Sequence, residues 1–227
     1  MTQRSALEQL MGRARGPMGP AIELDFGVAR GPLAELGQVI SRMNGFFLFN
    51  GGIQVFRVGE EGLGPDMLAW NTDTLWKSTY AGLADDLFCF GQDLFGTQFA
   101  ILGDEEVVRF DPETAQVKPL GASLEDWARW LSDPDVNGVN SFAHAFQKEN
   151  GALEPDERLI PLQLFVTGGS YDFDNLSVKD AAVAMQIRAP SPRRSTMHRK
   201  APRFDSAPSE PAFPPRGVLG SAAHPAA

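Results

Sequence analysis

The sequence predicts an α+β fold built on a mainly antiparallel sheet. Short segments dense in aromatic and β-branched residues alternate with tight-turn signals, most clearly between Phe88 and Thr114, which is typical of consecutive antiparallel strands. Segments with apolar residues at helical spacing lie before and after them. The chain has 227 residues and is 43% hydrophobic, so it is long enough to bury a substantial core.

Three segments of the chain differ in composition. Residues 1–30 give mixed signals, with a short helical pattern at Ser5 to Leu10 and an alternation at Ile22, Leu24 and Phe26 that suits an edge strand. Residues 190–227 contain eight of the 17 prolines, a composition typical of disorder. We therefore expect a poorly defined extension at 1–30, a folded domain at 31–188, and a disordered Pro/Arg-rich tail at 189–227.

Local signals order the elements of the folded domain. A helix is predicted from Pro32 to a stop at Asn44-Gly45, followed by a hairpin around Asn50 to Gly52. The aromatic strands then turn at Gly103-Asp104 and at Asp111 to Thr114. Later elements are a return strand at 117–120, a helix opened by the capping box Ser123 to Asp126, a helix at 141–150, a strand at 159–166 and a helix at 180–188.

Charge is distributed unevenly along the chain. Residues 190–227 carry six basic and two acidic residues of the 20 and 29 in the whole chain, which leaves 14 basic and 27 acidic residues, or −13, in the body. A body this acidic repels nucleic acid and anionic membranes and favours a basic protein partner. Simple solubility is the alternative explanation. The basic tail, with Arg193-Arg194 and His198 to Lys200, either contacts an acidic surface or is a plain extension.

Cysteine and terminal signals indicate the compartment. The single cysteine, Cys89, cannot form an internal disulfide and lies between two phenylalanines, so we expect a buried, inert thiol in a reducing environment. The N-terminus lacks the apolar stretch of a signal peptide, and no run of about 18 apolar residues exists. These features predict a cytoplasmic protein that does not enter membranes.

The residues for catalysis or metal binding do not form a recognisable pattern. His144 is the only histidine before the tail, and no nucleophile elbow or phosphate-binding loop is present. We therefore expect no cofactor, no metal and no enzymatic activity. Carboxylates are abundant, for example at Asp85-Asp86, Asp93 and Glu105-Glu106. A carboxylate-dependent hydrolase remains an alternative on that account, and two carboxylates converging in a deep pocket would support it.

An acidic contact surface is the better use of the same residues. The candidate partner-binding residues are Asp85, Asp86, Asp104, Glu105 and Glu106, with Trp70 and Trp76 as aromatic anchors. Trp70 and Trp76 precede the aromatic strands and have two interpretations, as a cover laid on the sheet or as exposed anchors. Trp127 and Trp130 lie at helical spacing and are expected in the core.

The order of these segments resembles a known family. The series consists of Asn44-Gly45-Phe46, Phe47 to Phe49, Ile53 to Phe56, Trp70-Asn71, Trp76, Tyr80, Gln92 to Phe99, Phe110 to Thr114, Ser123 to Trp127, Arg158 to Pro161, Phe165 to Gly169 and Asn175-Leu176. Together these look like the bacterial branch of the SMI1/KNR4 (SUKH) superfamily, over roughly residues 33–188. The specificity lies in the ordered series, since no single motif is diagnostic.

The resemblance implies a curved, mainly antiparallel sheet flanked by helices. It also implies a non-catalytic protein-binding module, such as an immunity protein that neutralises a toxin, often a nuclease, by stoichiometric binding. A regulatory or scaffold protein without a toxin partner is the alternative within the same family. The chain departs from the family pattern at Gly51-Gly52, where small and acidic residues are usual. It departs again at Ala115, where glycine is usual, so we expect strain in the turn that follows Asp111.

Overall fold

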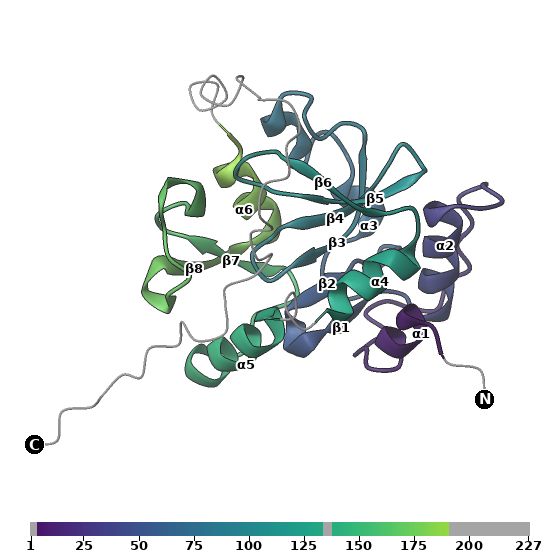
Figure 1. Cartoon of the computed structure of the whole chain (residues 1–227), viewed down its shortest axis with the longest axis horizontal. Helices are drawn as coiled ribbons and strands as arrows, with labels where there is room; N and C mark the ends of the chain where they lie inside the picture. Colours follow the sequence, from purple (N-terminus) through teal and green to yellow (C-terminus); the bar gives the residue numbers. More distant parts are fainter. Residues whose placement is uncertain (1–3, 134–137, 191–227) are drawn as a thin grey trace, which may run out of the picture.

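The sheet at the centre of the molecule is a six-stranded antiparallel meander (Figure 1). The computed structural model describes residues 4–133 and 138–190. Every strand pairs with its neighbour in sequence, in the order β1 (Phe46–Leu48), β2 (Ile53–Val55), β3 (Leu87–Asp93), β4 (Gln98–Leu102), β5 (Glu106–Phe110) and β6 (Val117–Gly121). The α+β fold predicted from the sequence is confirmed. From residue 191 on, the predicted disordered tail lies outside the described residues.

Helices cover both faces of this sheet. They are α1 (Ala6–Met11), α2 (Pro32–Arg42), α3 (Met67–Trp70), α4 (Leu124–Ser132), α5 (Gly138–Asn150) and α6 (Ala181–Arg188), with short 3-10 turns η1 (Phe49–Gly51), η2 (Lys77–Tyr80), η3 (Phe165–Thr167) and η4 (Phe173–Asn175). Phe99 of β4 packs against Trp127 of α4, whereas its neighbour Gln98 bonds to Trp70 of α3. Since consecutive strand residues point to opposite faces, α4 and α3 lie on opposite sides.

The turns form where the sequence predicts them. Asn50 has φ of 54° and Gly51 has φ of 82° in the loop between β1 and β2, and Gly45 has φ of 72° after α2. In the turn between β5 and β6, the Asp111 carboxylate accepts hydrogen bonds from the N–H groups of Glu113 and Thr114. Ala115 takes a left-handed φ of 55° there, which confirms the expected strain.

The N-terminal segment partly confirms the predictions for residues 1–30. The helical pattern at Ser5 to Leu10 is confirmed as α1, whose Ser5 cap accepts from Glu8 N–H. The predicted edge strand at Ile22 to Phe26 is wrong, because these residues run extended across α2 with the Leu24 N–H bonded to Ser41 Oγ rather than to a strand. Arg15 instead forms the bridge to β1, exchanging two backbone hydrogen bonds with Phe47.

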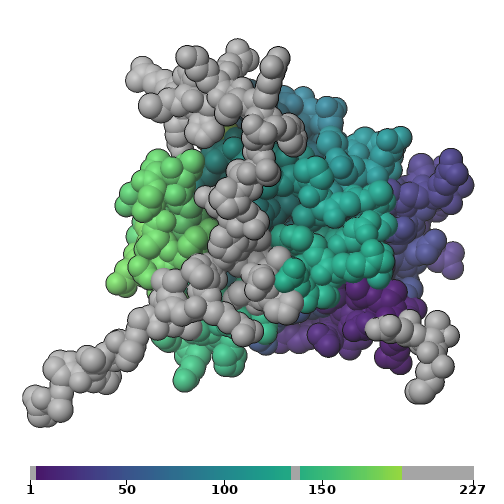
Figure 2. Space-filling model, in the orientation of Figure 1, coloured from purple at the N-terminus to yellow at the C-terminus, as the bar shows by residue number. Residues whose placement is uncertain are grey.

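A smaller unit packs on the side of the sheet (green in Figures 1 and 2). The antiparallel strands β7 (Glu157–Pro161) and β8 (Leu176–Asp180) pair with each other and lead into α6. The predicted strand at 159–166 is therefore too long. It ends at Pro161 because Asn175 bonds both the N–H and the carbonyl of Gln163 and closes a loop there.

Aromatic rings fill the core between these layers. On one face, Trp127 of α4 meets Phe90 and Phe99 edge-on. Trp127 is 1% exposed, as expected, while Trp130 is half-buried and carries Arg109 over its ring. Within residues 4–133 and 138–190, none of the helices has the length and apolar character needed to cross a bilayer.

Candidate protein-binding surface

The five predicted acidic contact residues meet at one end of the sheet. Leu87, the first residue of β3, pairs with Leu102 at the end of β4, and Leu102 pairs with Glu106 at the start of β5. The loop carrying Asp85 and Asp86 and the hairpin carrying Asp104 and Glu105 therefore emerge side by side, one strand spacing of about 5 Å apart. We call residues 81–86 and 103–106 the acidic end.

Both loops have backbone conformations that push their tips into solvent. Gly103 and Asp104 have φ of 57° and 62°, the pair of positive φ angles that a tight two-residue hairpin requires. Ala81 and Gly82 are also left-handed, and Ala84 is fully buried beneath the loop. The buried alanine anchors the loop while the residues on either side of it stay outside.

The carboxylates of the acidic end have no partner within the described part of the chain. Asp85, Asp86, Asp104 and Glu105 are exposed and Glu106 is half-buried. None of the five side chains makes a hydrogen bond or an ion pair with residues 4–133 or 138–190. Unpaired carboxylates at a surface remain free to attract a basic partner.

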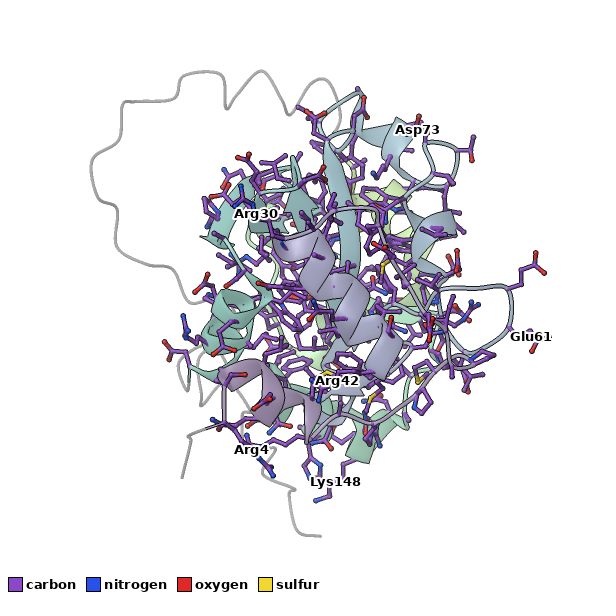
Figure 3. All side chains as sticks on the ribbon, turned by 90° about the vertical axis from the view of Figure 1, so that its right-hand side faces the viewer. Arg4, Arg30, Arg42, Glu61, Asp73 and Lys148 are labelled. Atoms are coloured by element: carbon purple, nitrogen blue, oxygen red, sulfur yellow. The ribbon has the colours of Figure 1, made fainter. Side chains whose placement is uncertain are left out.

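The N-terminus of α2 borders this surface. A β-carbon added to Gly31 would lie 3.3 Å from the Asp104 carbonyl, so the helix start touches the hairpin. Figure 3 views the molecule from this side and shows Arg30 at the upper end of α2, while Arg4, Arg42 and Lys148 lie toward the lower edge. Arg30 therefore lies near the acidic end, whereas Arg4, Arg42 and Lys148 lie away from it. A second cation, the buried Lys77, donates to the Leu87 carbonyl next to Asp86.

The two predicted aromatic anchors are wrong. Trp70 is 2% exposed and Trp76 is fully buried. Both indole N–H groups are satisfied inside the fold, since Trp70 donates to Gln98 Oε1 at 2.8 Å and Trp76 donates to the Trp70 carbonyl at 2.9 Å. Tyr80 and Phe110 complete the aromatic cluster around Trp76. The interpretation of these tryptophans as a cover laid on the sheet is the correct one.

An exposed leucine lies at the acidic end, where the two tryptophans do not reach the surface. Leu83 lies in the middle of the 81–86 loop and is 53% exposed. In the sequence, Leu83 is the single large apolar residue of the run Ala81-Gly-Leu-Ala-Asp-Asp86. This run shows neither helical nor strand periodicity, so no pattern predicts that Leu83 is buried. Sequence reasoning overlooked it because aromatic residues are the more common anchors at interfaces.

Two other carboxylates, Asp93 and Glu113, are buried and bonded within the fold. Asp93 Oδ1 accepts from the N–H groups of Phe95 and Thr97 at 2.8 and 2.9 Å. Burial raises the pKa of Asp93, against the opposing effects of those hydrogen bonds and of Arg109. Glu113 pairs with Arg188 at 3.2 Å, and both are 3% exposed as side chains. Each carboxylate thus has partners of its own, which accounts for its burial without a substrate.

Cys89 lies in β3, where its backbone bonds to the side chain of Asn71 at the end of α3. It is fully buried, and this burial raises the pKa of its thiol to about 12, although nearby Lys77 acts in the opposite direction. A thiol with so high a pKa carries almost no thiolate near neutral pH. The predicted burial of this thiol is confirmed. In the described ranges, no three His, Cys, Asp or Glu side chains gather closely enough to hold a metal ion.

Comparison with solved structures shows a similarity of fold at low sequence identity. The crystal structure of Atu4351 from Agrobacterium tumefaciens is similar, with 16% sequence identity and a TM-score of 0.43, over 66% of this chain and 72% of that chain. No family model matches the sequence, and no curated protein matches it. The functional argument therefore rests on the residues of this chain.

Proposed function

We propose that this chain is a non-catalytic protein-binding module of the SMI1/KNR4 type that serves as an immunity protein in the cytoplasm. It neutralises a toxin, such as a nuclease, by binding it stoichiometrically. One observation carries the proposal: the exposed, unpaired carboxylates of Asp85, Asp86, Asp104 and Glu105 lie in the two neighbouring loops of the acidic end, together with the exposed Leu83. Acidic residues around an apolar contact suit a basic protein surface.

The charge of the body supports the same partner. With 14 basic and 27 acidic residues before residue 190, the long-range field attracts cationic proteins and repels nucleic acid. A nuclease that binds nucleic acid presents a basic surface, so a protein of this charge can reach it quickly and cover it. A regulatory or scaffold protein with a basic, non-toxic partner is the alternative, and it would use the same surface.

The test begins with capture of the partner from the native host on the tagged full-length chain. The captured protein is then expressed alone and together with this chain. If the chain is an immunity protein, the partner expressed alone should arrest growth and co-expression should restore it. One equivalent of this chain should then inhibit the partner's activity completely. A partner that forms the complex without any toxicity would favour the regulatory alternative. A partner whose activity is unchanged in the complex would contradict both the immunity role and a regulatory role.

The surface is tested by charge reversal. The variant D85K/D86K/D104K/E105K is expected to slow association by about tenfold or more, with a weaker dependence of the rate on salt. The control is D172K/D174K, which reverses two acids that are also exposed but lie in the smaller unit. Leu83→Ser should mainly speed dissociation, because it removes an apolar contact. Equal rates for the acidic-end and control variants would exclude the acidic end as the contact surface.

A further inference from the structure

A small cavity lies on the side of the molecule formed by β1 and α5. The space open to the centre of a water molecule is about 60 Å³, and its walls include Arg15, Phe47, Leu94, Phe146, Glu154 and Arg158. Gln147 of α5 donates to the Asn50 carbonyl and holds the helix against the loop that follows β1. Segments from four parts of the chain thus enclose the cavity.

The lining combines apolar walls with an excess of positive charge. Phe47, Leu94 and Phe146 are the large apolar residues of the lining, with Leu153. Arg15 and Arg158 are the two cations of the lining, against the single carboxylate of Glu154. A mostly apolar hollow with a few charged groups is the usual composition of a small-ligand site. The net charge of this lining favours an anion.

Arg158 is a buried cation without a carboxylate in contact. It is 2% exposed, and its guanidinium donates to Gln54 Oε1 and to the Glu157 carbonyl. Its Nε and Nη2 also donate to the side-chain amide oxygen of Gln92, at 3.1 and 3.2 Å, so its hydrogen-bond partners are all neutral. Burial lowers the pKa of Arg158 to about 10, while Asp93 and Asp156 act in the opposite direction from a distance. Asp93 is already bonded to two backbone N–H groups. A buried charge whose hydrogen-bond partners are neutral, with carboxylates acting only from a distance, is costly, and an anion at the cavity would lower that cost.

The size of the cavity limits the ligand. Since one water molecule needs about 10–15 Å³ by this measure, the cavity has room for roughly four waters, too few for a nucleotide or a sugar phosphate. We propose that the cavity binds the carboxylate of a short apolar acid, with Arg15 and Arg158 on its charge and Phe47 and Phe146 beside its carbon chain. The same chemistry is offered by a free short-chain acid and by the C-terminal residue of a peptide. This site lies apart from the acidic end and does not depend on the proposed function.

The test uses the full-length chain and follows arginine Nε–Hε signals by NMR at constant ionic strength. Sodium butyrate and N-acetyl-alanyl-alanine represent the two sources, and butyramide and the peptide amide are their uncharged counterparts. Binding predicts saturable shifts of the Arg158 and Arg15 signals with a carboxylate and none with its amide. If only the peptide acid binds, the ligand is a peptide C-terminus; if only butyrate binds, it is a free acid. Shifts with neither acid, or equal shifts with acid and amide, would overturn the proposal.

Variants at the rim test the contact without disturbing the core. Arg15→Gln should weaken binding about tenfold or more, because it removes a hydrogen bond to a charged group. Ala152→Trp, at an exposed position of the lining, should abolish binding by filling the opening. Arg13→Gln is the matched control, since Arg13 is exposed and two residues away but outside the lining. Equal affinity for Arg15→Gln and Arg13→Gln would contradict the assignment of Arg15.

Discussion

At the scale of single residues, Ala115 and Asp93 are both held in states that are costly on their own. Ala115 has φ of 55° and donates its N–H to the Asp111 carbonyl at 2.8 Å. A left-handed conformation costs an L-residue about 1–2 kcal/mol. Asp93 keeps a carboxyl group in the interior beside the end of β3. The surrounding turns impose both states, since each residue closes a hydrogen-bonded loop.

Replacing Ala115 by glycine should stabilise the protein. Glycine removes the steric cost of the left-handed φ but loses more backbone entropy on folding, so the expected net gain is about 0.5–1 kcal/mol. Urea unfolding measures the change. Ala69→Gly is the control, because Ala69 lies in helix α3 and glycine there should destabilise by about 1 kcal/mol. A loss of stability for Ala115→Gly would mean that the turn is not strained.

Asp93 should make stability fall as the pH rises. Its pKa is raised in the folded protein by burial, so between its ordinary value of about 4 and the raised value the native state holds a proton that the unfolded state has lost. Asp93→Asn keeps an oxygen that can accept from Phe95 and Thr97 but does not ionise. The difference in unfolding free energy, wild type minus variant, should therefore decrease from about pH 4 upward. A difference that stays constant with pH would show that Asp93 has an ordinary pKa.

At the scale of elements, carboxylates at helix N-termini connect three helices on one face of the sheet. Glu35 of α2 accepts from the Leu124 N–H at the start of α4, at 2.6 Å. Glu125 of α4 accepts from the N–H groups of Ala6 and Leu7 at the start of α1, at 2.8 and 3.0 Å. Free N–H groups and the helix dipole both favour a negative charge at this position. Each helix thus fixes the orientation of the next.

Loss of the Glu125 charge should release α1. Burial acts to raise the pKa of Glu125, but the hydrogen bonds from Leu7 and Ala6, with Ser5 and Arg129, lower it below its usual value. A lowered pKa contributes stability above the ordinary value of about 4 that is lost as the pH falls through the folded pKa. Glu125→Gln should therefore lower the hydrogen-exchange protection factors of Ala6 and Leu7 severalfold at neutral pH, and acid should lower the same protection factors in the wild type. Glu149→Gln, at an exposed site of α5, should leave that exchange unchanged.

At the scale of the whole molecule, a buried polar layer joins the smaller unit to the sheet. Gln54, Gln92 and Gln98 stand side by side on β2, β3 and β4. Gln54 bonds to Gln92, to the Pro155 carbonyl and to Arg158 of β7. Buried polar groups are costly unless every partner is present. This layer therefore specifies how the two parts fit, in addition to the apolar contacts.

Replacing Gln54 by methionine should loosen the smaller unit. The substitution keeps the volume but removes the hydrogen bonds of Gln54 to the Arg158 guanidinium and to the Pro155 carbonyl, both in the interior, so we expect a loss of about 2–4 kcal/mol. Hydrogen exchange should rise more in β7 and β8 than in β4 and β5. Gln38→Met, at an exposed position of α2, is the control. Uniform exchange changes across both parts would indicate that the layer does not join them specifically.

The candidate surface was predictable where the signal was local. Gly103-Asp104 is a hairpin signal by itself, so the exposure of Asp104 and Glu105 followed from the sequence. The burial of Trp70 and Trp76 did not, because it depends on partners far along the chain, such as Gln98 and Phe110. A tryptophan is buried or exposed according to the residues that pack over it, and the spacing of residues in the sequence does not predict which residues those are.

The sequence by itself determined the order of the strands and the turns between them. Left-handed glycines, the Asp111 turn and the Ser123 cap depend on interactions within a few residues, so the local sequence predicts them. Only the tertiary structure decided which acids share one end of the sheet, that Leu83 is exposed there while Trp70 and Trp76 are buried, and that Arg158 is buried beside a cavity. These depend on strand register and on contacts between residues more than a hundred positions apart, such as Gln54 with Arg158, and no local pattern encodes such contacts.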